Sequence, residues 1–174
     1  MTKRMYTAFK NTDLHALSAF ETIVHIMHYS PLIALHRYQQ WELSLAKPDQ
    51  SLDFLTRSYA LLNVNKERLL DVLPTYSLPP NVRCLRVVST SVHVDVASVL
   101  DTLNRQFGHP LTGLSHHVVW DLHVTVDHLT DQDVDKAIEE EVLKKVVWLS
   151  CLSDGLLVNP LLESATCSLL SASS

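Results

Sequence analysis

Two stretches in the C-terminal half alternate strictly between apolar and polar residues. In residues 86–96 every second side chain from Val88 onward is valine or threonine, and in residues 117–127 every second side chain is apolar. A period of two is typical of a β-strand with one buried side and one side facing water. We therefore predict two strands with an open polar face, which carries His93, Asp95, His117, Asp121, His123, Thr125 and Asp127.

The N-terminal half has a helical period instead. Apolar residues recur at helical spacing after Asp13, which can cap a helix that runs to about residue 30. Pro31 fits the first turn of a second helix, which we expect to end near residue 45. Two further helices are predicted over residues 51–62 and 66–73, and the prolines at positions 74, 79 and 80 then end the helical half.

The segments around the two strands complete the predicted fold. We expect a helix over residues 96–107 ended by Gly108, and a helix over residues 131–145 that Thr130 and Asp133 begin as a capping box. An apolar strand should follow over residues 146–152. This pattern favours an α+β fold in which an N-terminal helical segment packs on a ferredoxin-like sandwich. The expected divisions are a helical subdomain (1–78), a ferredoxin-like subdomain (79–160) and a flexible tail (161–174).

Composition narrows the function classes. Apolar residues make up 47% of the chain and charged residues 19%, which is ordinary for a globular protein. A net charge of −5 argues against nucleic-acid binding, because a phosphate-binding surface needs clustered Lys and Arg. With three glycines in all, the chain has no phosphate-binding loop and no dinucleotide fingerprint.

The location is predicted from what the sequence lacks. We find no signal-peptide core at the N-terminus and no run of about 18 apolar residues, so we expect a cytoplasmic protein without a membrane partner. Its three cysteines form no CxxC pair. We expect Cys84 and Cys151 to be buried and inert, and Cys167 to lie in the tail.

The polar strand face is the first candidate for chemistry. Imidazole and carboxylate groups are suited to metal ligation or to acid–base work near neutral pH. A solvated sheet face or a subunit contact would carry the same residues.

Two local resemblances involve this face. Residues 123–126, His-Val-Thr-Val, resemble the His-x-Thr motif of 2H phosphoesterases, which implies His123 and Thr125 as catalytic residues. In that family a second motif faces the first; His93 would supply it, although Asp95 stands where Ser or Thr is expected. Residues 120–141 are similar to the strand and helix of the cytoplasmic domain of cation diffusion facilitator transporters, which implies a ferredoxin-like fold.

A second candidate lies on the first predicted helix. Glu21, His25 and His28 are spaced by four and three residues, which places them on one helical face. Such a face can hold a divalent transition metal, with a further ligand such as His36. The alternative is a structural role at the edge of the core.

These observations leave three functional hypotheses. The first is a non-catalytic binding, assembly or accessory protein that acts through the open sheet face, with a protein partner or by self-association. The second is a small histidine-based enzyme that uses His93, His123 and Thr125. The third is a metal-binding regulator that uses Glu21, His25 and His28.

Overall fold

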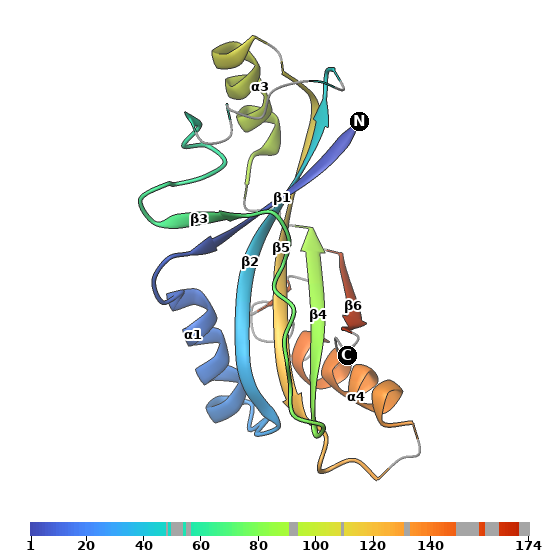
Figure 1. Cartoon of the computed structure of the whole chain (residues 1–174). Coiled ribbons are helices and arrows are strands. Elements are labelled where there is room, and N and C mark those ends of the chain that lie inside the picture. Colours follow the sequence, from blue (N-terminus) through green and yellow to red (C-terminus); the bar gives the residue numbers. More distant parts are fainter. Residues whose placement is uncertain are drawn as a thin grey trace. The chain divides into compact units, whose positions relative to one another are not determined.

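A computed structural model describes residues 1–47, 49, 54, 57–90, 94–108, 110–130, 133–148, 157–158 and 164–170. The fold is mixed α+β, with a six-stranded antiparallel sheet in the order β3-β1-β2-β5-β4-β6 (Figure 1). The strands are β1 (Thr2–Phe9), β2 (Leu32–Leu45), β3 (Glu67–Leu70), β4 (Val82–Thr90), β5 (Leu111–Thr125) and β6 (Ala165–Leu169). The helices are α1 (Leu14–Glu21), α3 (Val96–Phe107) and α4 (Val134–Val142), and two π-helical turns follow α1 and α4, η1 (Thr22–Ile26) and η2 (Leu143–Trp148).

The chain divides into two compact units, and β2 and β5 contribute to both. Unit 1 comprises residues Met1–Thr12, Tyr38–Leu73 and Ser91–Val118. Unit 2 comprises Asp13–Arg37, Pro74–Thr90 and Val119–Ser174. Each unit draws on chain from both sides of residue 78, and the predicted subdomain boundaries stay predictions.

Unit 1 is built on β1, which pairs with both β2 and β3. Its core is made of side chains from the strands, from α3, whose Leu103 is fully buried, and from Phe54 and Leu61 between β2 and β3. Asp95 caps the start of α3 by accepting a hydrogen bond from the Ser98 amide, and Gly108 ends it in the left-handed conformation (φ 74°). Glycine is favoured there because a left-handed backbone strains residues that have a Cβ. The core residues are Met5, Trp41, Leu43, Leu45, Phe54, Leu61, Leu103 and Leu111.

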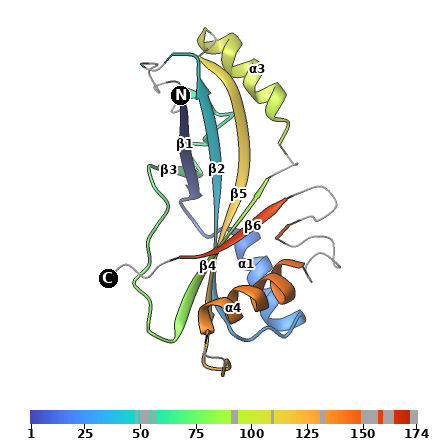
Figure 2. The ribbon, with the colours of Figure 1, turned by 90° about the vertical axis from the view of Figure 1, so that its right-hand side faces the viewer.

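Unit 2 contains the rest of β2 and β5 together with β4 and β6. Asp13 caps α1 by accepting hydrogen bonds from the amides of His15 and Ala16, and Asp133 caps α4. Figure 2 shows α1 and α4 on one side of these strands and residues 74–81 running along the other side. We call residues 74–81 the covering segment. The fully buried residues of the helices, Ile23, Ile138 and Val142, belong to the helix-covered side.

Several predicted elements are confirmed. The helix over residues 96–107 with Gly108 after it is α3, and the two alternating stretches overlap β4 and β5. The helices expected after Asp13 and near residue 131 are α1 with η1 and α4 with η2, although Asp133, not Thr130, is the cap of α4. In the described part of the chain, six antiparallel strands and three α-helices agree with the α+β class.

Other predicted elements are wrong. Residues 31–45, predicted as a helix, form β2, and the helix expected over 66–73 is replaced by β3. Both segments are strands because they pair with β1, and packing against a neighbouring strand overrides a weak local preference for helix. Residues 146–148, expected to begin a strand, belong to η2, and the rest of that prediction lies outside the described residues. Residues 165–169, inside the expected tail, form β6.

Candidate functional site

The predicted open face is closed at its centre. Asp121 on β5 is fully buried, and His123 is 7% exposed, so the expectation that both face water is wrong. The covering segment lies over this face (Figure 2). Its Tyr76 donates a hydrogen bond to Asp121 Oδ2 (3.0 Å). Burial of a carboxylate requires such partners, because an unpaired buried charge is very unfavourable.

A bidentate ion pair neutralises Asp121. Arg86 on β4 donates from Nε to Asp121 Oδ1 (2.7 Å) and from Nη2 to Oδ2 (2.7 Å), and it also contacts the Pro74 carbonyl (3.4 Å). The hydrogen bonds to Asp121 raise the pKa of Arg86, so the guanidinium stays charged. Asp121 is therefore occupied in holding the covering segment against the sheet.

His123 lies in a cluster of three rings. The ring of Tyr76 is 4.3 Å from it between centroids, and the ring of His36 is 5.1 Å away. Among the described residues, His123 Nε2 has no hydrogen-bond partner. Burial lowers the pKa of His123, and the neighbouring His36 lowers it further, so the imidazole is neutral at physiological pH.

Three other residues predicted on this face, Thr125, Asp95 and Asp127, have partners outside the cluster. The Thr125 hydroxyl donates to the Pro31 carbonyl (3.4 Å), and Asp95 caps α3 in unit 1. Asp127 accepts a hydrogen bond from Asn81 (2.8 Å). His93 lies outside the described residues, so its distance from His123 is not tested. The catalytic assignment to His93, His123 and Thr125 stays a prediction.

The predicted metal ligands are not gathered. Within the described part of the chain, no three His, Cys, Asp or Glu side chains lie close enough to hold a metal ion. Glu21, His25 and His28 are all described. They share a face only if the helix continues, whereas the chain leaves the π-helical turn after Ile26 and His28 takes a left-handed conformation (φ 55°).

A hollow in unit 2 was not predicted from the sequence. Its volume is about 470 Å³, and the described residues that line it are Met27, His28 and Tyr29, which follow η1, and Lys145 of η2. Both flanking segments are π-helical turns, which are rare and occur frequently at functional sites. His28 is the one residue other than glycine with a positive φ among those described, and such strained backbone clusters at ligand sites.

Tyr29 gives this hollow a polar group. The residue is 5% exposed, and its hydroxyl has no hydrogen-bond partner among the described residues. Burial raises the pKa of Tyr29, and the nearby carboxylate of Glu141 raises it further. The hydroxyl therefore keeps its proton at physiological pH.

Glu141 on α4 is held by two basic side chains. His128 Nε2 lies 3.0 Å from Oε2, and Lys145 Nζ lies 3.3 Å from Oε1. Burial acts to raise the pKa of Glu141, but these two partners outweigh it and the net shift is downward. The carboxylate is therefore ionised and already partnered.

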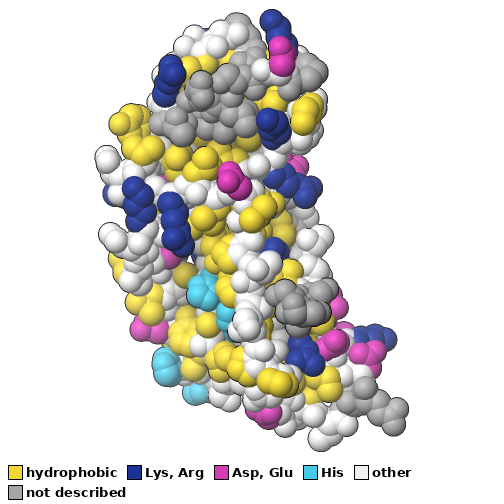
Figure 3. Space-filling view, viewed as in Figure 1, with side chains coloured by type: hydrophobic (Ala, Val, Ile, Leu, Met, Phe, Trp, Pro, Cys, Tyr) yellow, Lys and Arg dark blue, Asp and Glu magenta, His cyan; other side chains and the backbone are white. Residues whose placement is uncertain are grey.

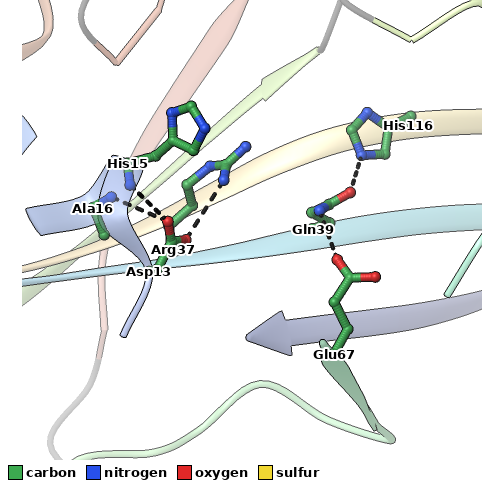
Figure 4. A network of polar contacts seen from close by, with 7 residues as sticks. All are labelled: Asp13, His15, Ala16, Arg37, Gln39, Glu67 and His116. Carbon is green, nitrogen blue, oxygen red and sulfur yellow. Dashed lines mark hydrogen bonds and ion pairs between the residues drawn. The ribbon is translucent and has the colours of Figure 1, made fainter. Parts of the chain in front are cut away.

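Figure 4 shows two further polar networks, one in each unit. In unit 2, Arg37 lies 3.5 Å from the Asp13 carboxylate that caps α1. In unit 1, Gln39 connects His116 (3.2 Å) and Glu67 (3.0 Å). Both networks join neighbouring elements, and we assign them structural roles.

The comparisons with known proteins add no identification. No protein-family model, curated protein or solved structure matches this chain. Among the described residues no helix is both long and apolar enough to span a bilayer. Any functional proposal must therefore come from the site itself.

Proposed function

We propose that this chain is a non-catalytic binding protein that receives a small molecule in the hollow lined by Met27, His28, Tyr29 and Lys145. The observation that carries the proposal is a hollow of about 470 Å³ with a buried hydroxyl that makes no hydrogen bond to any described residue. Cavities of roughly 300–1,000 Å³ with a few convergent polar groups are typical of ligand sites. A ligand atom would supply the hydrogen bond that Tyr29 lacks.

The cluster on the sheet supports binding over catalysis. A general acid or base must come within hydrogen-bond reach of a substrate. The carboxylate of Asp121 instead accepts hydrogen bonds from Arg86 and Tyr76, and the Thr125 hydroxyl donates to the Pro31 carbonyl. Neither group is free to act on a phosphodiester in this conformation.

Filling the hollow tests the proposal. N-phenyl-1-naphthylamine, an uncharged dye whose fluorescence rises in apolar sites, serves as the probe. We expect saturable binding to the native chain and its loss in Met27→Trp, since the larger side chain occupies the space. Leu17→Trp is the matched control, because Leu17 is 43% exposed on α1 and does not line the hollow. Equal binding to both variants would refute the proposed site.

Self-association is a second candidate, which one observation favours. Four large apolar side chains between residues 14 and 33 of unit 2 are exposed: Leu14 (73%), Leu17 (43%), Ile26 (73%) and Ile33 (48%). Figure 3 shows hydrophobic and histidine side chains side by side on the surface over α1 and η1. Exposed apolar patches often mark interfaces, and a second copy of this chain would cover one patch with another.

Light scattering tests self-association directly. We expect the mass of the native chain to rise with concentration, and Leu17→Glu to restore the monomer mass. Leu69→Glu provides a control in unit 1, where the side chain is similarly exposed (38%). A monomer mass at all concentrations would exclude self-association.

A further inference from the structure

We propose that the covering segment is a pH-sensitive lid, which leaves the sheet when His123 takes up a proton in mild acid. This lid belongs to the polar face of unit 2 and does not depend on the hollow or on a ligand there. It follows from the way residues 74–81 are held, from the position of His123 beneath them, and from the charges around its ring.

The covering segment is attached to the sheet mainly by side chains. Residues 74–79 belong to no helix or strand, so they lack the ladder of backbone hydrogen bonds that fixes the strands beneath. Tyr76 is partly buried and donates to the Asp121 carboxylate (3.0 Å), whereas the flanking residues 75 and 77 are exposed. Segments held in this way open locally at a lower free energy than the strands of a core.

His123 lies beneath this segment in surroundings that suit a neutral ring. The residue is 7% exposed, and the neutral phenol ring of Tyr76 packs against it edge to face, with 4.3 Å between centroids. No described residue accepts a hydrogen bond from His123 Nε2. A protonated imidazole has N–H donors on both nitrogens, and burying that charge away from water is unfavourable. Removal of Tyr76 would let water reach the ring.

The charged and titratable groups around the ring act in the same direction on balance. Burial is the largest cause that lowers the pKa of His123, and the His36 ring on β2, 5.1 Å away, lowers it further. Asp121 on β5 acts to raise it, but this carboxylate is paired with Arg86 of β4. Cys84 of β4 is uncharged in this range, because burial and then Asp121 raise its pKa to about 12.

The sign of the coupling follows from these surroundings. His123 binds a proton less readily under the covering segment than in water, where an imidazole has a pKa of about 6.5. Acid therefore favours the open form, and the equilibrium constant for opening rises by up to roughly tenfold per pH unit below that value.

Two cysteines on opposite sides of the sheet can report the opening. Cys84 is 2% exposed and lies on the same side of β4 as Arg86, since alternate residues of a strand share a side. Cys167 of β6 pairs with Val87, on the other side of β4. Burial and then Glu139 of α4 raise the pKa of Cys167, which agrees with a place on the helix-covered side.

Thiol labelling with dithiodipyridine, mapped by mass spectrometry, provides the test. Each rate is divided by the rate of the urea-unfolded chain at the same pH. Between about pH 7.5 and about pH 5.5 we expect Cys84 labelling of the native chain to rise several-fold, up to about tenfold, while Cys167 labelling does not follow it. A rise below about twofold at Cys84 would overturn the proposal. So would an equal rise at both cysteines, which would mean unfolding of the whole unit.

Substitutions assign the acid response to His123. His123→Gln keeps a neutral polar side chain, so Cys84 should be labelled at the same relative rate at both pH values. His117→Gln is the matched control, since His117 is a partly buried histidine of β5 that lies in unit 1, and it should keep the response. An acid response that persists in His123→Gln, or that is lost in His117→Gln, would overturn the role of His123.

Tyr76→Phe tests the attachment without changing His123. It keeps the ring but removes the hydrogen bond to Asp121, so Cys84 labelling should be about tenfold faster at both pH values, as expected for the loss of a hydrogen bond to a charged group. Labelling as slow as in the native chain would show that Tyr76 does not hold the covering segment, and would overturn the lid.

Discussion

Replacement of Asp121 by Asn would test how the covering segment is held. The change keeps the side-chain volume but removes the charge that faces Arg86, whose two nitrogens lie 2.7 Å from the Asp121 oxygens. Asp121 is fully buried and the Arg86 side chain is 17% exposed, so the guanidinium would be left with little water. Breaking a buried pair typically costs 3–5 kcal/mol, and the partial exposure of Arg86 places our estimate at about 3 kcal/mol.

The chain contains a matched control for this change. Arg83 Nε also lies 2.7 Å from an aspartate oxygen, that of Asp135, but these side chains are 30% and 53% exposed. We expect Asp135→Asn to cost less than about 1 kcal/mol, as exposed ion pairs do. The two pairs share a donor atom and a distance, so the difference measures burial together with the second hydrogen bond, from Arg86 Nη2 to Asp121.

Urea unfolding followed by circular dichroism would measure both variants. A second arm replaces both partners, Arg86→Met with Asp121→Leu, and should recover most of the lost stability, because a buried ion pair is often replaceable by apolar residues. Equal losses for Asp121→Asn and Asp135→Asn would refute the reasoning. So would a double variant no more stable than Asp121→Asn, since the cost would then not arise from a stranded charge.

Three further predictions concern single groups. Burial lowers the pKa of His123, and His36 lowers it further. In the unfolded chain this histidine has a pKa of about 6.5 and takes up its proton at a higher pH than in the folded chain. The free energy of unfolding should therefore fall as the pH drops below that value. His123→Gln should flatten the profile of unfolding free energy between about pH 5 and 6.5, where carboxylates remain ionised; a profile equal to that of the native chain would contradict this. Gly108→Ala should lower the free energy of unfolding in urea by about 1 kcal/mol. The new Cβ would meet no atom within 4 Å, so the only cost is the backbone strain of a residue with a Cβ at φ 74°; an unchanged urea midpoint would contradict this. Burial raises the pKa of Cys84 to about 12, so a disulfide reagent at about pH 8 should label this thiol only in urea, and labelling of the native chain, mapped by mass spectrometry, would contradict the expected inertness.

Local signals predicted the elements that local interactions determine. The helix α3 has its cap at Asp95, an apolar stripe and Gly108 in immediate sequence, and each can be read without knowledge of the fold. The same is true of Asp13 at the start of α1. The alternating strands were recognised by period, although β4 begins at Val82 and β5 at Leu111, earlier than the alternation indicated.

Long-range pairing determines the elements that were missed. β6 consists of small residues that look like a tail, and it is a strand because its Cys167 pairs with Val87 of β4. β1 begins with charged residues that hide its alternation, and its partners lie in β2 and β3. Nothing within either segment specifies a partner so distant in sequence.

The candidate site was unpredictable for a related reason. Tyr29 and Lys145 come from opposite ends of the chain and meet only in the folded unit. The π-helical turns and the left-handed backbone at His28 carry no recognised sequence signature. The histidines predicted on the polar strand face follow the period of two of a β-strand. That pattern could not reveal that residues 74–81 would cover this face.

The order of the elements along the chain explains why residues 1–78 were predicted to form a separate helical subdomain. The strand–helix–strand run β1-α1-β2 places its helix in unit 2, although β1 itself lies in unit 1. The run β4-α3-β5 does the reverse, since β4 lies in unit 2 and α3 in unit 1. The helix α3 therefore buries its apolar stripe in a core that includes strands of the other run, because its Leu103 belongs to the core of Trp41 and Leu43. Periodicity shows that a helix has an apolar face, but it does not show which strands cover that face, and here they are encoded in the other half of the chain.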